Sequence, residues 1–151
     1  MYLDTNPGLP DPDLQAGFYD GVTAKRLVAW VIDMVLIGVV TAVIVLFTAF
    51  IALFFLPVVF LTVGFVYRVV TLAGASATPG MRLMGIEFRD RTGHRFDLAH
   101  AGLHTLGYTL SLSMVLPQVV SVILMLTSSR GQGLTDIVLG SAAINRPADR
   151  G

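Results

Sequence analysis

The stretch KRLVAWVIDMVLIGVV, residues 25–40, is apolar enough to enter a lipid bilayer, yet it holds an aspartate, Asp33, near its middle. An ionised carboxylate inside a membrane is costly unless it is paired, hydrogen-bonded or protonated. Acidic residues at such positions also often mark functional sites. The partners of Asp33 therefore bear on both the fold and the function of this chain.

The composition predicts a membrane protein. Apolar residues make up 54% of the 151 residues, charged residues make up only 13%, and the mean hydropathy is +0.75. Soluble domains carry roughly 25% charged residues, so this chain has too few charges to cover a water-facing surface. Its length fits one domain.

Charge and cysteine content exclude several classes of protein. The net charge is zero, which provides no general attraction to nucleic acid, so we expect no nucleic-acid partner. The absence of cysteine excludes disulfides, iron–sulfur clusters and thiol catalysis. The sequence places no Ser-His-Asp arrangement on one surface and no two carboxylates close enough in sequence for hydrolysis. We therefore predict a protein that is not an enzyme and that needs no cofactor.

Apolar segments predict the helices. Residues 27–72 are apolar almost throughout, and a single crossing needs only roughly 20 residues. We therefore expect a hairpin of two transmembrane helices, at about 24–48 and 50–72, with a turn near 47–50. Pro57 falls inside the second predicted helix and predicts a kink there.

A third apolar segment covers about residues 101–127 and is long enough to cross the membrane once. Pro117 in its second half permits a different path, in which the segment bends and returns to the side from which it entered. The sequence favours an all-α membrane protein in either case.

The remaining segments are more polar. Residues 1–21 read as an irregular tail, too acidic for a signal peptide, and residues 147–151 form a short C-terminal tail, which leaves 22–146 as the membrane domain. Within residues 73–100, MRLMGIEF is typical of a strand and RDRTGH of a turn, which predicts a small β-hairpin at the membrane surface. Residues 138–145 could form a second short strand.

Basic residues predict the orientation, because Lys and Arg concentrate on the cytoplasmic side of bacterial membranes. They flank the first predicted helix at its start and follow the second, whereas the turn at 47–50 has none. The N-terminus and the 73–100 loop should therefore be cytoplasmic. The same rule favours a cytoplasmic C-terminus, which requires the bent path for the third segment, but a full crossing stays open.

Two residues are candidate partners of Asp33. Arg26 precedes it by seven residues, close to two helical turns, so both side chains share one face. Arg68 lies near the same level across the predicted hairpin, and we predict an Asp33–Arg68 ion pair with Tyr67 as a hydrogen-bond donor. Such a pair could serve only to fix the helix register, or Asp33 could bind a cation or a proton during transport.

Two further motifs have a structural interpretation and a functional one. His100 and His104 stand four residues apart, a spacing that can hold a metal, but the pattern is more typical of an interfacial helix face, so we predict no metal site. The glycine-rich turn of residues 74–80 lacks the lysine of a phosphate-binding loop. Within it, Thr78 and Pro79 should cap the start of a short helix.

Three motifs follow one another along the chain, and they read AKRLVAWVID, TPGMRLMGIEFRDRTG and LTDIVLGSAAI. In this order they resemble the RDD family of small bacterial membrane proteins, named for one arginine and two aspartates. The resemblance covers about residues 16–146. It implies that the three family residues here are Arg26, Asp33 and Asp136. Two departures remove fixed positive charge: Met81 stands where the family usually has Lys, and a histidine, His100 or His104, where it often has Arg. These departures weigh against an anion site at those positions.

The resemblance also implies a role for Asp136, which should cap a short helix or reach Arg26. We therefore predict one polar cluster of Arg26, Asp33, Arg68 and Asp136 on the cytoplasmic side. Transport of ions or small ligands has been suggested for the family, and many members look like accessory proteins. We expect an accessory or assembly subunit of the bacterial inner membrane that contacts lipid and other subunits or copies of itself. The alternative is a transporter or antiporter component that uses Asp33 as its ion site.

Overall fold

A computed structural model describes residues 8–147, so the predicted C-terminal tail lies almost wholly outside the described residues, as does the start of the N-terminal tail. Helices dominate the described part, and a small sheet of two strands joins them. In chain order the elements are η1 (Ala16–Phe18), α1 (Val22–Phe47), η2 (Ile51–Phe55), α2 (Leu56–Ala75), α3 (Pro79–Leu83), β1 (Ile86–Arg89), α4 (Leu98–Ser113), α5 (Val115–Thr127), α6 (Leu134–Leu139) and β2 (Ala142–Asn145).

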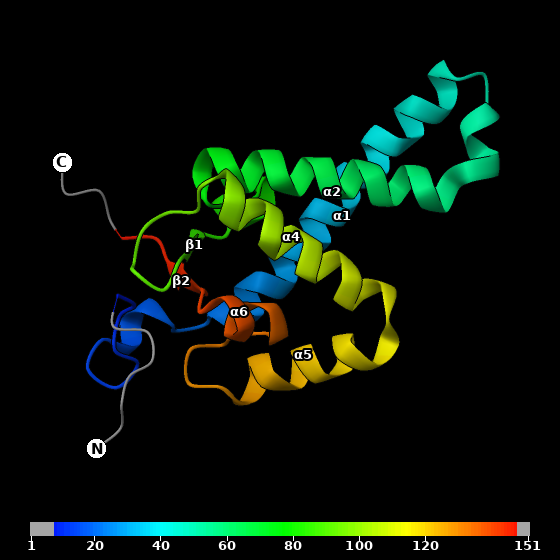
Figure 1. Cartoon of the computed structure of the whole chain (residues 1–151). Helices are drawn as coiled ribbons and strands as arrows, with labels where there is room; N and C mark the ends of the chain where they lie inside the picture. Colours follow the sequence, from blue (N-terminus) through cyan, green and yellow to red (C-terminus); the bar gives the residue numbers. More distant parts are fainter. Residues whose placement is uncertain (1–7, 148–151) are drawn as a thin grey trace.

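The predicted helical hairpin is present. The apolar stretches of Ala16–Phe47 and Ile51–Ala75 are each long and apolar enough to cross a membrane. The turn between them covers residues 48–50, as expected. Figure 1 shows α1 and α2 crossing each other, with the end of the hairpin that carries η2 projecting beyond the other helices.

Pro57 does not kink α2 but lies in its first turn, which corrects the sequence prediction. The preceding residues form the separate 3-10 helix η2 and not the start of a longer α-helix. Proline suits the first turn of a helix because the amide N–H groups there have no helical partner and its backbone angle is already helical. The proline therefore sets where α2 begins.

The third apolar segment is bent. The chain bends by 117° between helices α4 and α5, and the break is at Met114, whose backbone is extended. Pro117, the predicted hinge, lies three residues later in the first turn of α5, where it is tolerated. A hydrogen bond of 3.1 Å from Ser111 Oγ to Gln118 Oε1 joins the two arms of the bend.

The two strands form an antiparallel sheet in which Ile86 lies opposite Asn145 and Arg89 opposite Ala142. The strands therefore come from distant parts of the chain, where we had expected a local hairpin within residues 73–100. A turn with Gly93 does follow β1 as expected, closed by a bond of 3.0 Å from the Gly93 amide to the Asp90 carbonyl. Because β2 pairs with β1, the chain comes back to the side of the 73–100 loop, and both ends of the α4–α5 bend lie on that side.

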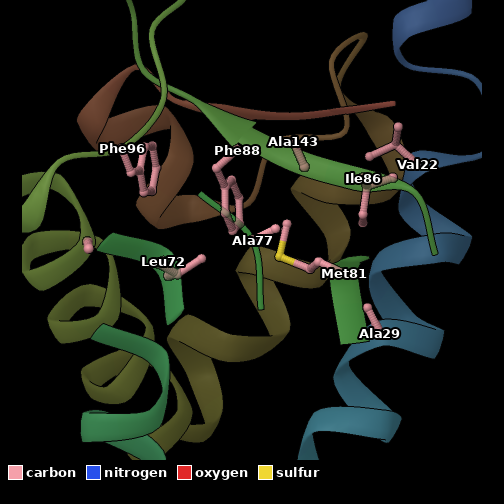
Figure 2. Close-up of a cluster of buried hydrophobic side chains, with 10 residues drawn as sticks. Val22, Ala29, Leu72, Ala77, Met81, Ile86, Phe88, Phe96 and Ala143 are labelled. Atoms are coloured by element: carbon pink, nitrogen blue, oxygen red, sulfur yellow. The ribbon is translucent and has the colours of Figure 1, made fainter. Parts of the chain in front are cut away.

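Most of the buried apolar side chains gather around the sheet, and fewer, such as Ile37, lie between the long helices. Figure 2 shows this cluster, in which Phe88 and Phe96 lie beside the end of α2 while Met81 and Ala29 join α3 to α1. The rings of Phe88 and Phe96 stack with 5.2 Å between their centroids. By contrast, only Arg68 and Leu72 are buried among the twenty residues of α2. The long helices thus keep most of their apolar side chains exposed, as expected of helices that meet lipid.

Helix α3 packs directly against the backbone of α1. A Cβ atom added to Gly80 would lie 2.2 Å from the Ala29 carbonyl oxygen and 2.9 Å from Asp33 Oδ1. No side chain fits into that space, so glycine is required at this position. This close approach brings the amide of Gly80 within hydrogen-bonding distance of the carboxylate of Asp33, at 2.9 Å.

We predict that Gly80→Ala pushes α3 away from α1 and lowers the free energy of unfolding by about 1–3 kcal/mol, the range for overpacked sites. Thermal unfolding in detergent, followed by circular dichroism, measures this. Gly74→Ala is the matched control, because a Cβ at Gly74 meets nothing within 4 Å. Equal stability of the two variants would contradict the close approach.

Candidate functional site

Asp33 is buried in α1 and its carboxylate accepts three hydrogen bonds. Oδ1 accepts from the Tyr67 hydroxyl at 2.7 Å and from the Gly80 amide at 2.9 Å, and Oδ2 accepts from Thr78 Oγ1 at 2.5 Å. Tyr67 is therefore the hydrogen-bond donor that the sequence predicted. Donors of this kind stabilise the charged form of a carboxylate that burial has removed from water.

The residues Thr78, Pro79 and Gly80 form the local motif that holds this carboxylate. Thr78 is the N-cap of α3, and its Oγ1 accepts from the Met81 amide at 3.2 Å, which confirms the predicted cap. Pro79 supplies the first residue of the helix, and Gly80 supplies an amide N–H that the helix itself leaves free. The Asp33 side chain thus lies at the start of α3 and ties α1 to it.

The predicted Asp33–Arg68 ion pair is wrong. No ion pair joins the two among the described residues, because neutral donors surround the carboxylate of Asp33. The guanidinium of Arg68 instead lies over the ring of Tyr108 on α4, with 3.9 Å from its carbon to the ring centroid. The Tyr108 hydroxyl in turn accepts a hydrogen bond of 2.7 Å from Trp30 Nε1 on α1. Arg68 therefore faces α4 across the hairpin.

Arg26 and Asp136 make the contact that the resemblance implied. Arg26 Nη1 donates to Asp136 Oδ2 at 2.7 Å and to the Gly131 carbonyl at 3.0 Å. His104 Nε2 lies 2.7 Å from Asp136 Oδ1, and the Gly133 amide donates to Oδ2 at 3.0 Å. Asp136 also lies in the first turn of α6, so it both caps that helix and joins it to α1 and α4.

The environment of Asp136 keeps it ionised. Burial by itself raises the pKa of this carboxyl, but the Arg26 guanidinium and the hydrogen bond from His104 outweigh burial and hold the pKa well below its ordinary value of 3.8. The ring of Phe88 covers the other side of Arg26, with 5.3 Å from the guanidinium carbon to the ring centroid. Because the ion pair is shielded from water, loss of either partner would leave a buried charge uncompensated and would destabilise the fold.

The two carboxylates and the three cationic or imidazole side chains line one cavity. Its volume is about 890 Å³, and it lies between α1, α2, α4, α5 and α6. The charged and imidazole residues in its wall are Arg26, Asp33, Arg68, His104 and Asp136. The predicted single cluster is thus two separate bonding centres, one around Asp33 and one around Asp136, with Arg68 bound to neither.

Some members of the site were not predicted. Trp30 and Tyr108 were not singled out, because a hydrogen bond between aromatic residues 78 positions apart leaves no local signal. His104 was noted as a replacement for an arginine of the family, and that position does contact Asp136. His100, four residues earlier, instead contacts Asp97 at 2.9 Å, so the two histidines bind different carboxylates. The described residues include no group of three or more side chains placed to hold a metal.

Comparison with known protein families identifies a match. The model of the RDD family matches residues 21–140, a range that contains Arg26, Asp33, Arg68 and Asp136. No curated protein and no solved structure matches the chain significantly.

We predict that Asp136→Asn lowers the free energy of unfolding by about 3–5 kcal/mol near neutral pH, because it leaves the Arg26 charge buried without its partner. The carboxyl of Asp136 has a lowered pKa in the folded protein, so its contribution to stability is complete above the unfolded value of 3.8 and is lost as the pH falls below it.

The difference in melting temperature between wild type and Asp136→Asn should therefore narrow in acid, below about pH 4. Asp13→Asn is the control, because it makes the same chemical change at an exposed position. A difference that stays constant down to the lowest pH would show that the charge of Asp136 contributes nothing to stability.

Proposed function

The chain belongs to the RDD family, since the family's model covers most of it, and on this premise we propose that it is a non-catalytic accessory or assembly subunit of a larger membrane complex. The proposal is supported first by how the charged residues of the family motif are used. Each of the three ties one segment of this chain to another, so their common effect is to fix the relative positions of α1, α3, α4 and α6.

The state of Asp33 argues against an ion site in a single copy of the chain. Its carboxylate already accepts from Tyr67, Thr78 and Gly80, and the residue is 1% exposed. A cation would have to displace these donors and separate α3 from α1. The three hydrogen bonds are the observation that carries the proposal, because they assign Asp33 a structural task.

The exposed faces of the long helices provide the surface for partners. Along α1 the buried residues form one narrow stripe of the type i, i+4, which includes Asp33, Ile37 and Thr41. The remainder of α1 is exposed or partly exposed, as are all residues of α2 except Arg68 and Leu72. In the membrane these faces contact lipid tails or other helices. In an accessory subunit, part of these faces forms the interface with the partner chains.

We propose that the sheet faces the cytoplasm of a bacterium and that the chain lies in the inner membrane with its N-terminus inside. Lys25, Arg82 and Arg146 all belong to the end of the molecule where β1 and β2 lie, and the pairing of the strands brings the C-terminal arginine Arg146 to the same side as the 73–100 loop. Clustering of basic residues on one side of the membrane supports this orientation.

A second candidate function is that of a transporter or antiporter component, as first considered for Asp33. The cavity favours it, because a space of about 890 Å³ with charged side chains in its wall falls within the size range of small-ligand sites. This function needs either a second copy of the chain or a rearrangement that frees Asp33 from its donors.

Crosslinking tests the subunit proposal. We predict that a photo-crosslinking residue at Val39, which is exposed on α1, captures an unlike membrane chain in the native membrane. The same residue at Ile37, two positions away and buried, is the control and should capture none. The captured chain should also purify with the protein at a fixed ratio in mild detergent. Crosslinks to lipid alone, or only to identical copies, would contradict the proposal.

A flux measurement separates the two candidates. Asp33→Asn should lower the free energy of unfolding by about 1–3 kcal/mol, because one hydrogen-bond acceptor is replaced by a donor in a buried site. Cation and proton flux into proteoliposomes should stay at the protein-free level for both wild type and variant, compared at equal amounts of folded protein. Flux that is present in the wild type and lost in a folded variant would support the transporter instead.

A further inference from the structure

Arg68 is the charged residue in the cavity whose bonding is incomplete. It is 7% exposed, and its Nε atom is buried without a hydrogen-bond partner among the described residues. Its guanidinium contacts the ring of Tyr108, which attracts the positive charge but accepts none of its in-plane N–H bonds. The other arginine of the cavity, Arg26, by contrast donates hydrogen bonds to Asp136 and to the Gly131 carbonyl through its Nη1 atom.

A guanidinium in this state needs an anion. Its five N–H donors form a planar fork that suits carboxylate and phosphate oxygens. A buried charge without hydrogen bonds is expensive. Arg68 lies seven residues before the end of α2, or about 10 Å along the helix axis, on the side of the sheet. With the end of α2 at the membrane surface, Arg68 would lie within reach of the head groups of the nearer leaflet.

The cavity has an apolar wall that continues to the surface of the protein. Leu27 and Trp30 on α1 and Val122 and Leu126 on α5 all line it. Each of these side chains is also exposed, Leu27 to 64% and Leu126 to 70%. The cavity therefore reaches the exterior beside exposed apolar side chains of α1 and α5, the kind of surface that faces acyl chains in a bilayer.

We propose that this cavity binds an anionic membrane lipid, with a phosphate oxygen of the head group on Arg68 and an acyl chain along the apolar wall formed by α1 and α5. The same guanidinium could hold a free phosphate ion. The apolar wall favours the lipid, because a soluble anion has no apolar part that could pack against this wall. This inference concerns a ligand and is independent of the subunit proposal.

Trp30 offers a direct test, because it is the single tryptophan of the chain and lines the cavity. Brominated acyl chains quench tryptophan fluorescence at short range. The experiment titrates the full chain in dodecyl maltoside micelles with either dibrominated phosphatidylglycerol or dibrominated phosphatidylcholine over the same range of mole fractions. We expect the anionic lipid to reach half-maximal quenching at about one fifth of the mole fraction that the zwitterionic lipid needs, or less, the preference that one arginine gives near a membrane surface.

Variants of Arg68 test whether the preference for the anionic lipid comes from this cavity. Arg68→Met removes the charge while keeping an apolar stem, and it should abolish the preference. Arg68→Lys keeps a charge but loses the planar fork, so it should retain part of the preference, and it serves if the methionine variant does not fold. Arg82→Gln, an exposed arginine of α3, is the matched control and should behave as wild type.

Three results would overturn the proposal. A preference that persists in Arg68→Met would show that Arg68 does not select the anion, and equal quenching by the two lipids in the wild type would show that no anion is selected. The third is inorganic phosphate that alters the Trp30 emission through Arg68 while no lipid preference is seen, because the ligand would then be a soluble anion.

Discussion

The carboxylate of Asp33 imposes the constraint on which this structure depends. A charge inside an apolar helix has to be supplied with donors, and no residue of α1 supplies them here. They come from the hydroxyl of Tyr67 on α2 and from the start of α3, where Thr78 and Gly80 donate. The segment after α2 is therefore drawn onto α1, so close that a side chain at Gly80 has no space. One buried charge thus fixes three segments relative to one another.

The carboxylate of Asp136 plays the same role in the C-terminal half of the chain. Asp136 lies in the first turn of α6 and accepts from Arg26 on α1 and from His104 on α4, so it holds the chain that follows the α4–α5 bend against both helices. The sheet lies beside both centres, and Phe88 of β1 contacts His104 as well as Arg26. Helix α1 is common to both centres. The polar residues of α1 therefore organise a protein in which few apolar side chains of the long helices are buried.

The sequence predicted those features that depend on local pattern or on the family motif. Composition and apolar length predicted the membrane class and the hairpin, and the motif predicted the contact between Arg26 and Asp136. The pairing of Asp33 with Arg68 was wrong, because charge alone suggested it, whereas backbone and hydroxyl donors of residues 78–80 satisfied the carboxylate. The pairing of β1 with β2 and the bond between Trp30 and Tyr108 were not foreseeable, because they join residues that only the tertiary fold brings together.

A double-mutant cycle between Asp33 and Thr78 tests most directly whether the aspartate acts as a tie between α1 and α3. The free energies of unfolding of wild type, Asp33→Asn, Thr78→Val and the double variant would be measured in one detergent. Residues that bond to each other couple, and the hydrogen bond between these two predicts a coupling energy of about 0.5–3 kcal/mol. A coupling energy of zero, with the two single effects simply adding, would contradict the account.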